Sequence, residues 1–332
     1  MAHGLPEREL HPVLGLMIDR MARRQTQTTP PDSHRLALAI EGGAMRGIVS
    51  MGMLAFLEQI GASGTFDDVF GASAGAINGA FFIARQAGMA TTVYYNEMLN
   101  PEFISFRRIL TTKPLVSLDY LLDEVVETDK PLDWEGVVAS STALHPIATS
   151  ASTFAPVVLS APRSKVELRE ALRASARIPG VAGEPVSIGD DSYFDASLLE
   201  SLGFRSALAA GATHVLVLRT RARGTLRTPP SLPERLLLQR KLKKFDSRLV
   251  EIYLNRDQAY REEVEELEQL TNASGPPFVL EVAPSASDPS VSQYTRSRQV
   301  VFDGAASGMR AMSNSLLGVE PRALDVITAF YG

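Results

Sequence analysis

The feature that most constrains this chain is the pentapeptide Gly71-Ala72-Ser73-Ala74-Gly75, which lies between two apolar segments. Val69-Phe70 before it predicts the end of a strand, and residues 76–84 after it predict a helix. A sharp strand-to-helix turn needs small residues around its apex, because larger side chains would clash there. Such a turn presents the serine hydroxyl at a helix N-terminus, where backbone N–H groups favour negative charge. The pattern favours a serine hydrolase, with simple helix–sheet packing of small residues as the alternative.

A glycine-rich loop lies about 30 residues upstream, between the expected strand 36–40 and an apolar helix that extends to about Ile60. Its sequence is Glu41-Gly42-Gly43-Ala44-Met45-Arg46-Gly47. A loop of this kind leaves several backbone N–H groups pointing into one concavity, which suits a phosphate or an oxyanion. The Lys-Ser/Thr pair of a phosphate loop and the glycine spacing of a dinucleotide site are both absent. We therefore expect an oxyanion hole beside Ser73.

Together these motifs resemble those of the patatin-like phospholipases. The family pattern is Gly-Gly-Gly-x-Arg/Lys-Gly, then Gly-x-Ser-x-Gly, then a distant Asp-Gly-Gly/Ala. The resemblance extends from about residue 35 to 219 and implies a three-layer α/β/α fold with a mostly parallel central sheet and helical insertions. The matching residues are Gly42, Gly43, Ala44, Arg46 and Gly47 in the loop, and Gly71, Ser73 and Gly75 in the turn.

The third motif of the family is matched by Asp195-Ala196-Ser197, with alanine where the family has glycine. A hairpin signal, Gly189-Asp190-Asp191, precedes it, as expected before the family's aspartate. A literal Asp-Gly-Ala begins at Asp303, but its surroundings predict a helix packed through small residues. We therefore assign the family's aspartate to Asp195. Either aspartate could instead simply accept hydrogen bonds at a turn or helix start.

The resemblance implies a Ser–Asp dyad without histidine, in which Asp195 takes the proton from Ser73 during attack on an ester. It also implies that Gly42, Gly43 and Ala44 form the oxyanion hole, and that Arg46 supports the loop or attracts an anionic head group. Alanine is expected to fit at positions 44 and 196 if neither backbone is left-handed. The implied substrates are phospholipids, lysophospholipids or related acyl lipids. A lipid-binding pseudoenzyme is the alternative, because Ala196 departs from the pattern.

A histidine-dependent esterase is a second alternative. His214 follows Ser73 and Asp195 in the chain order that such esterases use. However, His214 opens the expected strand 213–218, and catalytic groups of open parallel sheets gather at the carboxyl ends of strands. We therefore expect His214 to lie at the opposite edge of the sheet.

Composition limits the other functions. The 332 residues are 45% apolar, with no cysteine and a net charge of −5, which gives no support to nucleic-acid binding. No histidine or carboxylate cluster has ligand spacing, so no metal or cofactor is implied. Residues 1–10 lack the apolar stretch of a secretory signal, and no segment approaches the length of a membrane span. We expect a cytoplasmic protein that contacts membranes only peripherally, if at all.

The sequence predicts two parts: an N-terminal helix and linker over residues 1–34, and a catalytic domain over residues 35–332. The second part includes a C-terminal helical extension at about 230–272 and 290–330. Residues 94–126 mix apolar and basic side chains, which suits either a cap over an acyl chain or an ordinary helical insertion. Residues 233–270 have helical apolar spacing and predict one long amphipathic helix or a helix pair.

Overall fold

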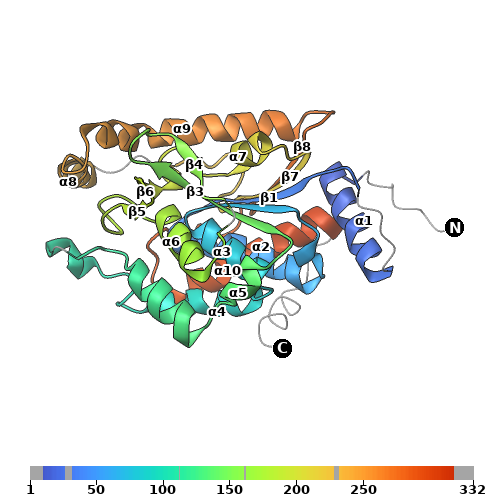
Figure 1. The fold of residues 1–332 in the computed structure, drawn as a ribbon, viewed down its shortest axis with the longest axis horizontal. Coiled ribbons are helices and arrows are strands. Elements are labelled where there is room, and N and C mark those ends of the chain that lie inside the picture. The colour runs from blue at the N-terminus through green and yellow to red at the C-terminus, as the bar shows by residue number, and fades with distance from the viewer. Residues whose placement is uncertain (1–9, 27–31, 112, 161, 228–231, 318–332) are drawn as a thin grey trace.

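The computed structural model describes residues 10–26, 32–111, 113–160, 162–227 and 232–317 (Figure 1). Eight strands in these residues form one sheet in the order β5-β6-β3-β2-β1-β7-β8, with β4 paired to β3 beside this path. Strands β3, β2, β1, β7 and β8 are parallel, whereas β4 and β6 are antiparallel to β3, and β5 is antiparallel to β6. The strands are β1 (Leu36–Ile40), β2 (Asp68–Ala72), β3 (Ala143–Ser150), β4 (Pro156–Val158), β5 (Val186–Ile188), β6 (Asp191–Asp195), β7 (His214–Leu218) and β8 (Phe278–Val282).

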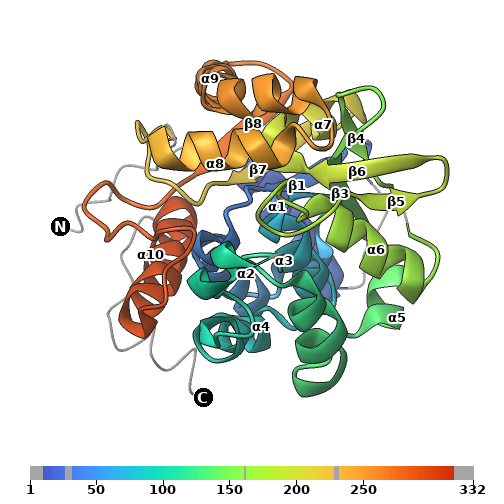
Figure 2. The same cartoon turned by 90° about the vertical axis from the view of Figure 1, so that its left-hand side faces the viewer.

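Helices cover both faces of this sheet (Figures 1 and 2), which gives the expected three-layer α/β/α arrangement. Helices α7, α8 and α9 lie on one side, and α2, α3, α4, α6 and α10 lie on the other. The helices are α1 (Pro12–Thr26), α2 (Ile48–Gln59), α3 (Ala74–Ile83), α4 (Ala87–Tyr95), α5 (Trp134–Val138), α6 (Lys165–Ser175), α7 (Phe204–Ala209), α8 (Leu232–Leu242), α9 (Ser247–Thr271) and α10 (Arg298–Leu317). Shorter 3-10 turns are η1 (Ala44–Gly47), η2 (Ala62–Gly64), η3 (Glu97–Leu99), η4 (Phe106–Leu110) and η6 (Ala196–Leu198), and η5 (Tyr120–Asp129) is a π-helix.

Strand β1 shows why both faces are covered. Leu36, Leu38 and Ile40 pack into the larger core with α2 and α10, while Ala37 and Ala39 face the core built with α7 and α9. Strands buried on both faces are typical of parallel sheets. The loop after β1 and the turn after β2 therefore stand on a rigid support, because both layers hold the central strands in place.

Helices α2 and α10 pack backbone to backbone. A Cβ atom at Gly52 would collide with the Ala305 carbonyl group, and one at Gly308 would collide with that of Val49. Asp303 accordingly lies within a packed helix, as its surroundings predict. Since α2 begins directly after η1, α10 also supports the glycine-rich loop.

The terminal segments mostly form the expected elements. Helix α1 covers the predicted N-terminal helix and docks on the sheet through buried apolar side chains, and the predicted segment 233–270 forms the pair α8 and α9. Of the predicted extension 290–330, α10 is described, while residues 318–332 lie outside the described residues, as do residues 1–9 and part of the linker. In the described ranges, no helix has both the length and the apolar character that crossing a bilayer requires.

Candidate active site

Ser73 lies at the tip of the turn between β2 and α3. Its backbone has φ 55° and ψ −126°, outside the regions that most residues adopt. A Cβ atom at Gly75 would collide with the Ile40 carbonyl group, so the turn packs directly on β1. The Ser73 N–H donates to Oγ of Ser175, a buried residue at the end of α6, at 3.0 Å. Ser175 thus stabilises the strained turn, and the sequence analysis did not identify this contact.

Asp195 ends β6 and reaches the same edge of the sheet as Ser73. Strand β3 lies between β2 and β6 and pairs Ile147 with Ala72 and Ala148 with Asp195. Ser73 is one residue beyond Ala72, so it is level with Asp195 across the small side chain of Ala148. With neighbouring strands about 4.8 Å apart, the two side chains can meet over β3.

The Asp195 carboxyl group is fully buried. Its Oδ1 accepts the Ser197 N–H at 2.7 Å, whereas Oδ2 forms no hydrogen bond with any described residue. Burial raises the pKa of Asp195 above its usual value, although Ser197 and the Ser73 hydroxyl oppose this rise. The Ser73 hydroxyl is therefore close to the carboxyl group but short of good hydrogen-bond geometry, which in unliganded sites often improves when substrate binds. One oxygen of Asp195 is thus fixed and the other is available to accept a proton.

The glycine-rich loop lies against the Ser73 turn. A Cβ atom at Gly42 would lie 2.5 Å from the Ala72 carbonyl oxygen and 2.8 Å from Ser73 Cβ, so only glycine allows this approach. The backbone N–H groups of Gly42, Gly43 and Ala44 donate to no acceptor in the described part of the chain. Unpaired donors beside a nucleophile are the arrangement that stabilises an oxyanion.

The condition for an unstrained alanine in this loop is not met. Ala44 has a left-handed backbone, with φ 49°, so it carries strain of about 1 kcal/mol that glycine would avoid. Ala196, by contrast, lies in η6 without a positive φ. The two alanine substitutions of the family pattern therefore differ, and only Ala44 is strained.

Charged residues within and after the glycine-rich loop hold it in place through hydrogen bonds. Arg46 is 8% exposed, and its Nε donates to Thr220 Oγ1 at 3.3 Å. Glu41 accepts hydrogen bonds from Arg221 Nη1 at 2.6 Å and from the Thr220 N–H at 2.5 Å. Burial alone would raise the pKa of Glu41, but the charges of Arg221, Arg219 and Arg46 hold it at about 2. Glu41 is therefore an ionised anchor for the start of the loop.

A narrow apolar cavity of about 40 Å³ opens beside Ser73. The predicted cap segment supplies much of its wall, and α3 supplies another part. Apolar walls of this kind suit an acyl chain. The residues from the cap are Tyr94, Met98, Phe103, Val116, Leu118 and Leu121, and those from α3 include Ile77 and Phe81.

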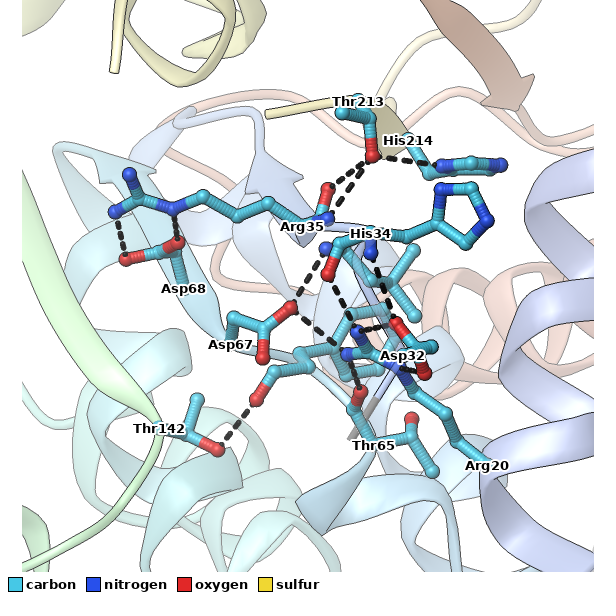
Figure 3. Close-up of polar contacts among 12 residues, drawn as sticks. Arg20, Asp32, His34, Arg35, Thr65, Asp67, Asp68, Thr142, Thr213 and His214 are labelled. Carbon is cyan, nitrogen blue, oxygen red and sulfur yellow. Dashed lines mark hydrogen bonds and ion pairs between the residues drawn. The ribbon is translucent and has the colours of Figure 1, made fainter. Parts of the chain in front are cut away.

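The two residues considered as alternatives for the site, His214 and Asp303, lie away from Ser73. His214 opens β7 at the amino edge of the sheet, where its Nδ1 lies 2.9 Å from Thr213 Oγ1, and Figure 3 shows it beside His34 and Arg35. Asp303 lies in α10 and accepts a hydrogen bond from Gln299 Nε2 at 2.9 Å. Neither residue joins Ser73. No group of three or more histidine, aspartate or glutamate side chains in the described residues could hold a metal ion.

Comparison with known proteins agrees with this geometry. The model of the patatin-like phospholipase family matches residues 38–208, about half of the chain. The chain belongs to this family. The matched span contains Ser73 and Asp195 but neither His214 nor Asp303.

One relative is an uncharacterized protein, YjjU, from Escherichia coli (strain K12). It is 30% identical to this chain over 189 residues, which are 56% of this chain and 52% of YjjU. The chain therefore spans about half the length of this curated relative.

Proposed function

We propose that this patatin-like protein is a serine lipid acyl hydrolase in which Ser73 is the nucleophile and Asp195 is the base. The observation that carries this proposal is the buried Asp195 Oδ2, without a hydrogen bond among the described residues, close to the Ser73 hydroxyl. A serine hydroxyl needs a base to take its proton during attack. No described histidine forms a hydrogen bond with either side chain, so Asp195 is the group available.

The chemistry follows from these positions. Ser73 Oγ bonds to the ester carbonyl carbon while its proton moves to Asp195 Oδ2. The negative carbonyl oxygen accepts hydrogen bonds from the N–H groups of Gly43 and Ala44, and loss of one such donor costs about 3 to 4 kcal/mol. The ester C–O bond then breaks, and the departing alcohol takes the proton back from Asp195. Water attacks the acyl-enzyme, Asp195 takes the water proton and returns it to Ser73, and the fatty acid leaves.

The apolar cavity supports an acyl lipid as the substrate. The acyl chain would enter the cavity beside Ser73, which must widen to admit it because about 40 Å³ is smaller than a small-molecule site. The alcohol product would be a lysophospholipid or glycerophosphate part. This places the proposed activity in the phospholipase A or lysophospholipase class.

A fluorophosphonate probe, which reacts with activated serines, tests the proposal. We expect labelling of the wild type and of His214→Ala, but not of Ser73→Ala. An unlabelled wild type would favour the pseudoenzyme, for which the strain at Ala44 is the structural argument. Loss of labelling in His214→Ala would instead favour the histidine-dependent esterase.

We also propose that contact with a lipid surface is peripheral and involves η4 in the cap. Phe106 is 49% exposed and is followed by the exposed Arg107. An exposed aromatic residue beside basic side chains suits an anionic bilayer surface. Sedimentation with anionic vesicles should be weaker for Phe106→Asp than for Val166→Asp. Val166 is the more exposed of the two apolar residues, at 60%, and lies at the far end of α6 from Ser175. Equal sedimentation of the two variants would contradict this contact.

A further inference from the structure

A second cavity, of about 470 Å³, lies next to the glycine-rich loop and shares no lining residue with the apolar cavity. All its lining residues except Arg46 and Val49 lie beyond residue 208, outside the family match. Its wall is unusually basic. The charged residues that line it are Arg46, Arg221, Arg227, Arg256, Asp257 and Asp288.

Ion pairs neutralise only some of these charges. The pairs are Arg221 with Glu41 at 2.6 Å, Arg256 with Asp257 at 3.9 Å, and Asp288 with Arg310. Arg46 and Arg227 have no carboxylate oxygen within 4.0 Å among the described residues. These two positive charges therefore have no ion pair within the described residues, although Glu41 acts on Arg46 and Asp195 on Arg227 from a greater distance.

Arg46 and Arg227 are also poorly solvated. Nη2 of Arg46 is buried and has no hydrogen-bond partner in the described ranges. Burial, followed by the charge of Arg221, lowers the pKa of Arg46 to about 9, and burial together with Arg221 and Arg256 lowers that of Arg227 to about 10. Confining like charges away from water without an anion is unfavourable, so a bound anion would stabilise this arrangement.

The cavity wall is bonded to both halves of the candidate active site. The N–H of Met45, next to Arg46 in the glycine-rich loop, donates to the carbonyl oxygen of Gln293 at 3.2 Å. Nη1 of Arg227 donates to the carbonyl oxygen of Ser197 at 2.8 Å, two residues after Asp195. A ligand in the cavity would thus touch residues that hold the oxyanion loop and the base.

We propose that this cavity binds a phosphate-bearing anion between Arg46 and Arg227. A guanidinium group offers paired donors that match two phosphate oxygens, and the volume lies within the range of small-molecule sites. Hydroxyl groups of Ser290 and Ser292 line the same space. The phosphate belongs either to a soluble molecule or to the head group of a lipid held at Ser73. Only the second source rests on the proposed function.

Calorimetric titration of the full chain with inorganic phosphate and with glycerol 3-phosphate, at constant ionic strength, tests the site. The Ser73→Ala protein serves as the parent, so the result does not depend on catalysis. We expect saturable binding that Arg227→Gln weakens by about tenfold or more, because a charge-assisted contact is lost. Arg223→Gln is the matched control, since Arg223 is 60% exposed and pairs with Glu281 at 2.7 Å.

If circular dichroism shows that Arg227→Gln is unfolded, Arg256→Gln replaces it and should also weaken binding. No saturable binding by the parent, or equal affinity of the parent and the folded cavity variant, would overturn the proposal.

Kinetics then distinguish the two sources of phosphate. For a lipid head group, inorganic phosphate should compete only with an acyl glycerol phosphate and should leave hydrolysis of a neutral p-nitrophenyl ester unchanged. For a soluble ligand, phosphate should change hydrolysis of that substrate and of a neutral p-nitrophenyl ester alike. Absence of ester hydrolysis with phosphate binding intact would refute the proposed function but leave the anion site standing.

Discussion

The two edges of the parallel sheet use similar charged residues in opposite ways. At the amino edge, Arg20 pairs with Asp32 and Asp67, each at 2.8 Å, and Figure 3 shows this network beside Arg35 and Asp68. At the carboxyl edge, Asp195 Oδ2 and Arg46 Nη2 are buried without hydrogen-bond partners among the described residues. The backbones of Ser73 and Ala44 at that edge are strained as well.

Two aspartates make the contrast specific. Burial favours a raised pKa at both Asp68 and Asp195. Asp68 contacts Arg35 Nε at 2.6 Å and His145 Nε2 at 2.7 Å, and these partners hold its pKa at about 2. Asp195 has no such pair, so its pKa stays raised. One residue type therefore stabilises the fold at one edge and lacks a charged partner at the other, where we propose that it accepts a proton.

The largest expected effect is that of Asp195→Asn on catalysis. Removing the base should lower kcat/KM by about 10³-fold or more, as for other residues of a catalytic unit. The free energy of unfolding should stay equal or rise, because a buried carboxyl group is replaced by a neutral amide. Ester hydrolysis and urea unfolding measure the two quantities. Asp303→Asn is the matched control and should leave both kcat/KM and the free energy of unfolding unchanged. Full activity of Asp195→Asn together with loss of activity in Asp303→Asn would reverse the assignment.

Asp68→Asn should show the opposite behaviour. This change leaves Arg35 and His145 without their carboxylate and should lower the free energy of unfolding by about 3 kcal/mol. We expect kcat/KM to change by no more than about twofold, because Asp68 begins β2 and Ser73 follows its end, at the opposite edge of the sheet. Urea unfolding and initial rates test both statements. A catalytic defect in Asp68→Asn without a loss of stability would break the distinction between the edges.

Lowering the pH should separate activity from folding. Asp195 must be ionised to act as base. Because its pKa is raised above 3.8, the usual value for aspartate, activity should be lost on acidification before the pH has fallen to 3.8. The pKa of Asp68 is depressed from 3.8 to about 2, so its contribution to stability, about 2 kcal/mol, is present above pH 3.8 and is lost only as the pH falls toward 2.

A pH range should therefore exist in which the protein is folded but inactive. Initial rates and the fluorescence of Trp134, the single tryptophan, follow the two properties in parallel. Recovery of full activity on return to neutral pH is the control. Coincident loss of rate and fluorescence signal would contradict the expected order.

Local motifs predicted the fold well, and they placed Ser73 and Asp195 at the ends of the strands from which the structure presents them. The strand and loop at 36–47, the turn at Ser73 and the hairpin before Asp195 each depend on neighbouring residues, so their pattern is visible in the sequence. Strand β3, over 143–150, shows a less regular pattern. His145 and Thr149 interrupt the apolar pattern there because they bond to Asp68 and to the Asp195 carbonyl oxygen.

Other features depend on residues far apart in the chain. Ser175 meets Ser73 across 102 positions, and the basic cavity joins Arg46 to residues beyond 220. No local spacing indicates such contacts. The left-handed backbone of Ala44 is also not predictable from the sequence, because alanine rarely adopts this conformation.

The sheet order has a practical consequence for anyone who trims this protein. Residues 38–208 carry the family pattern, yet β1 is bonded on one side to β7, which is bonded in turn to β8. A fragment cut to the matched span would lack β7, so the hydrogen-bonding edge of β1 would be exposed. It would also lack α10, which packs against α2 through Gly52 and Gly308. The family-matched core and its flanking segments are thus one structural unit, and a minimal version must retain both.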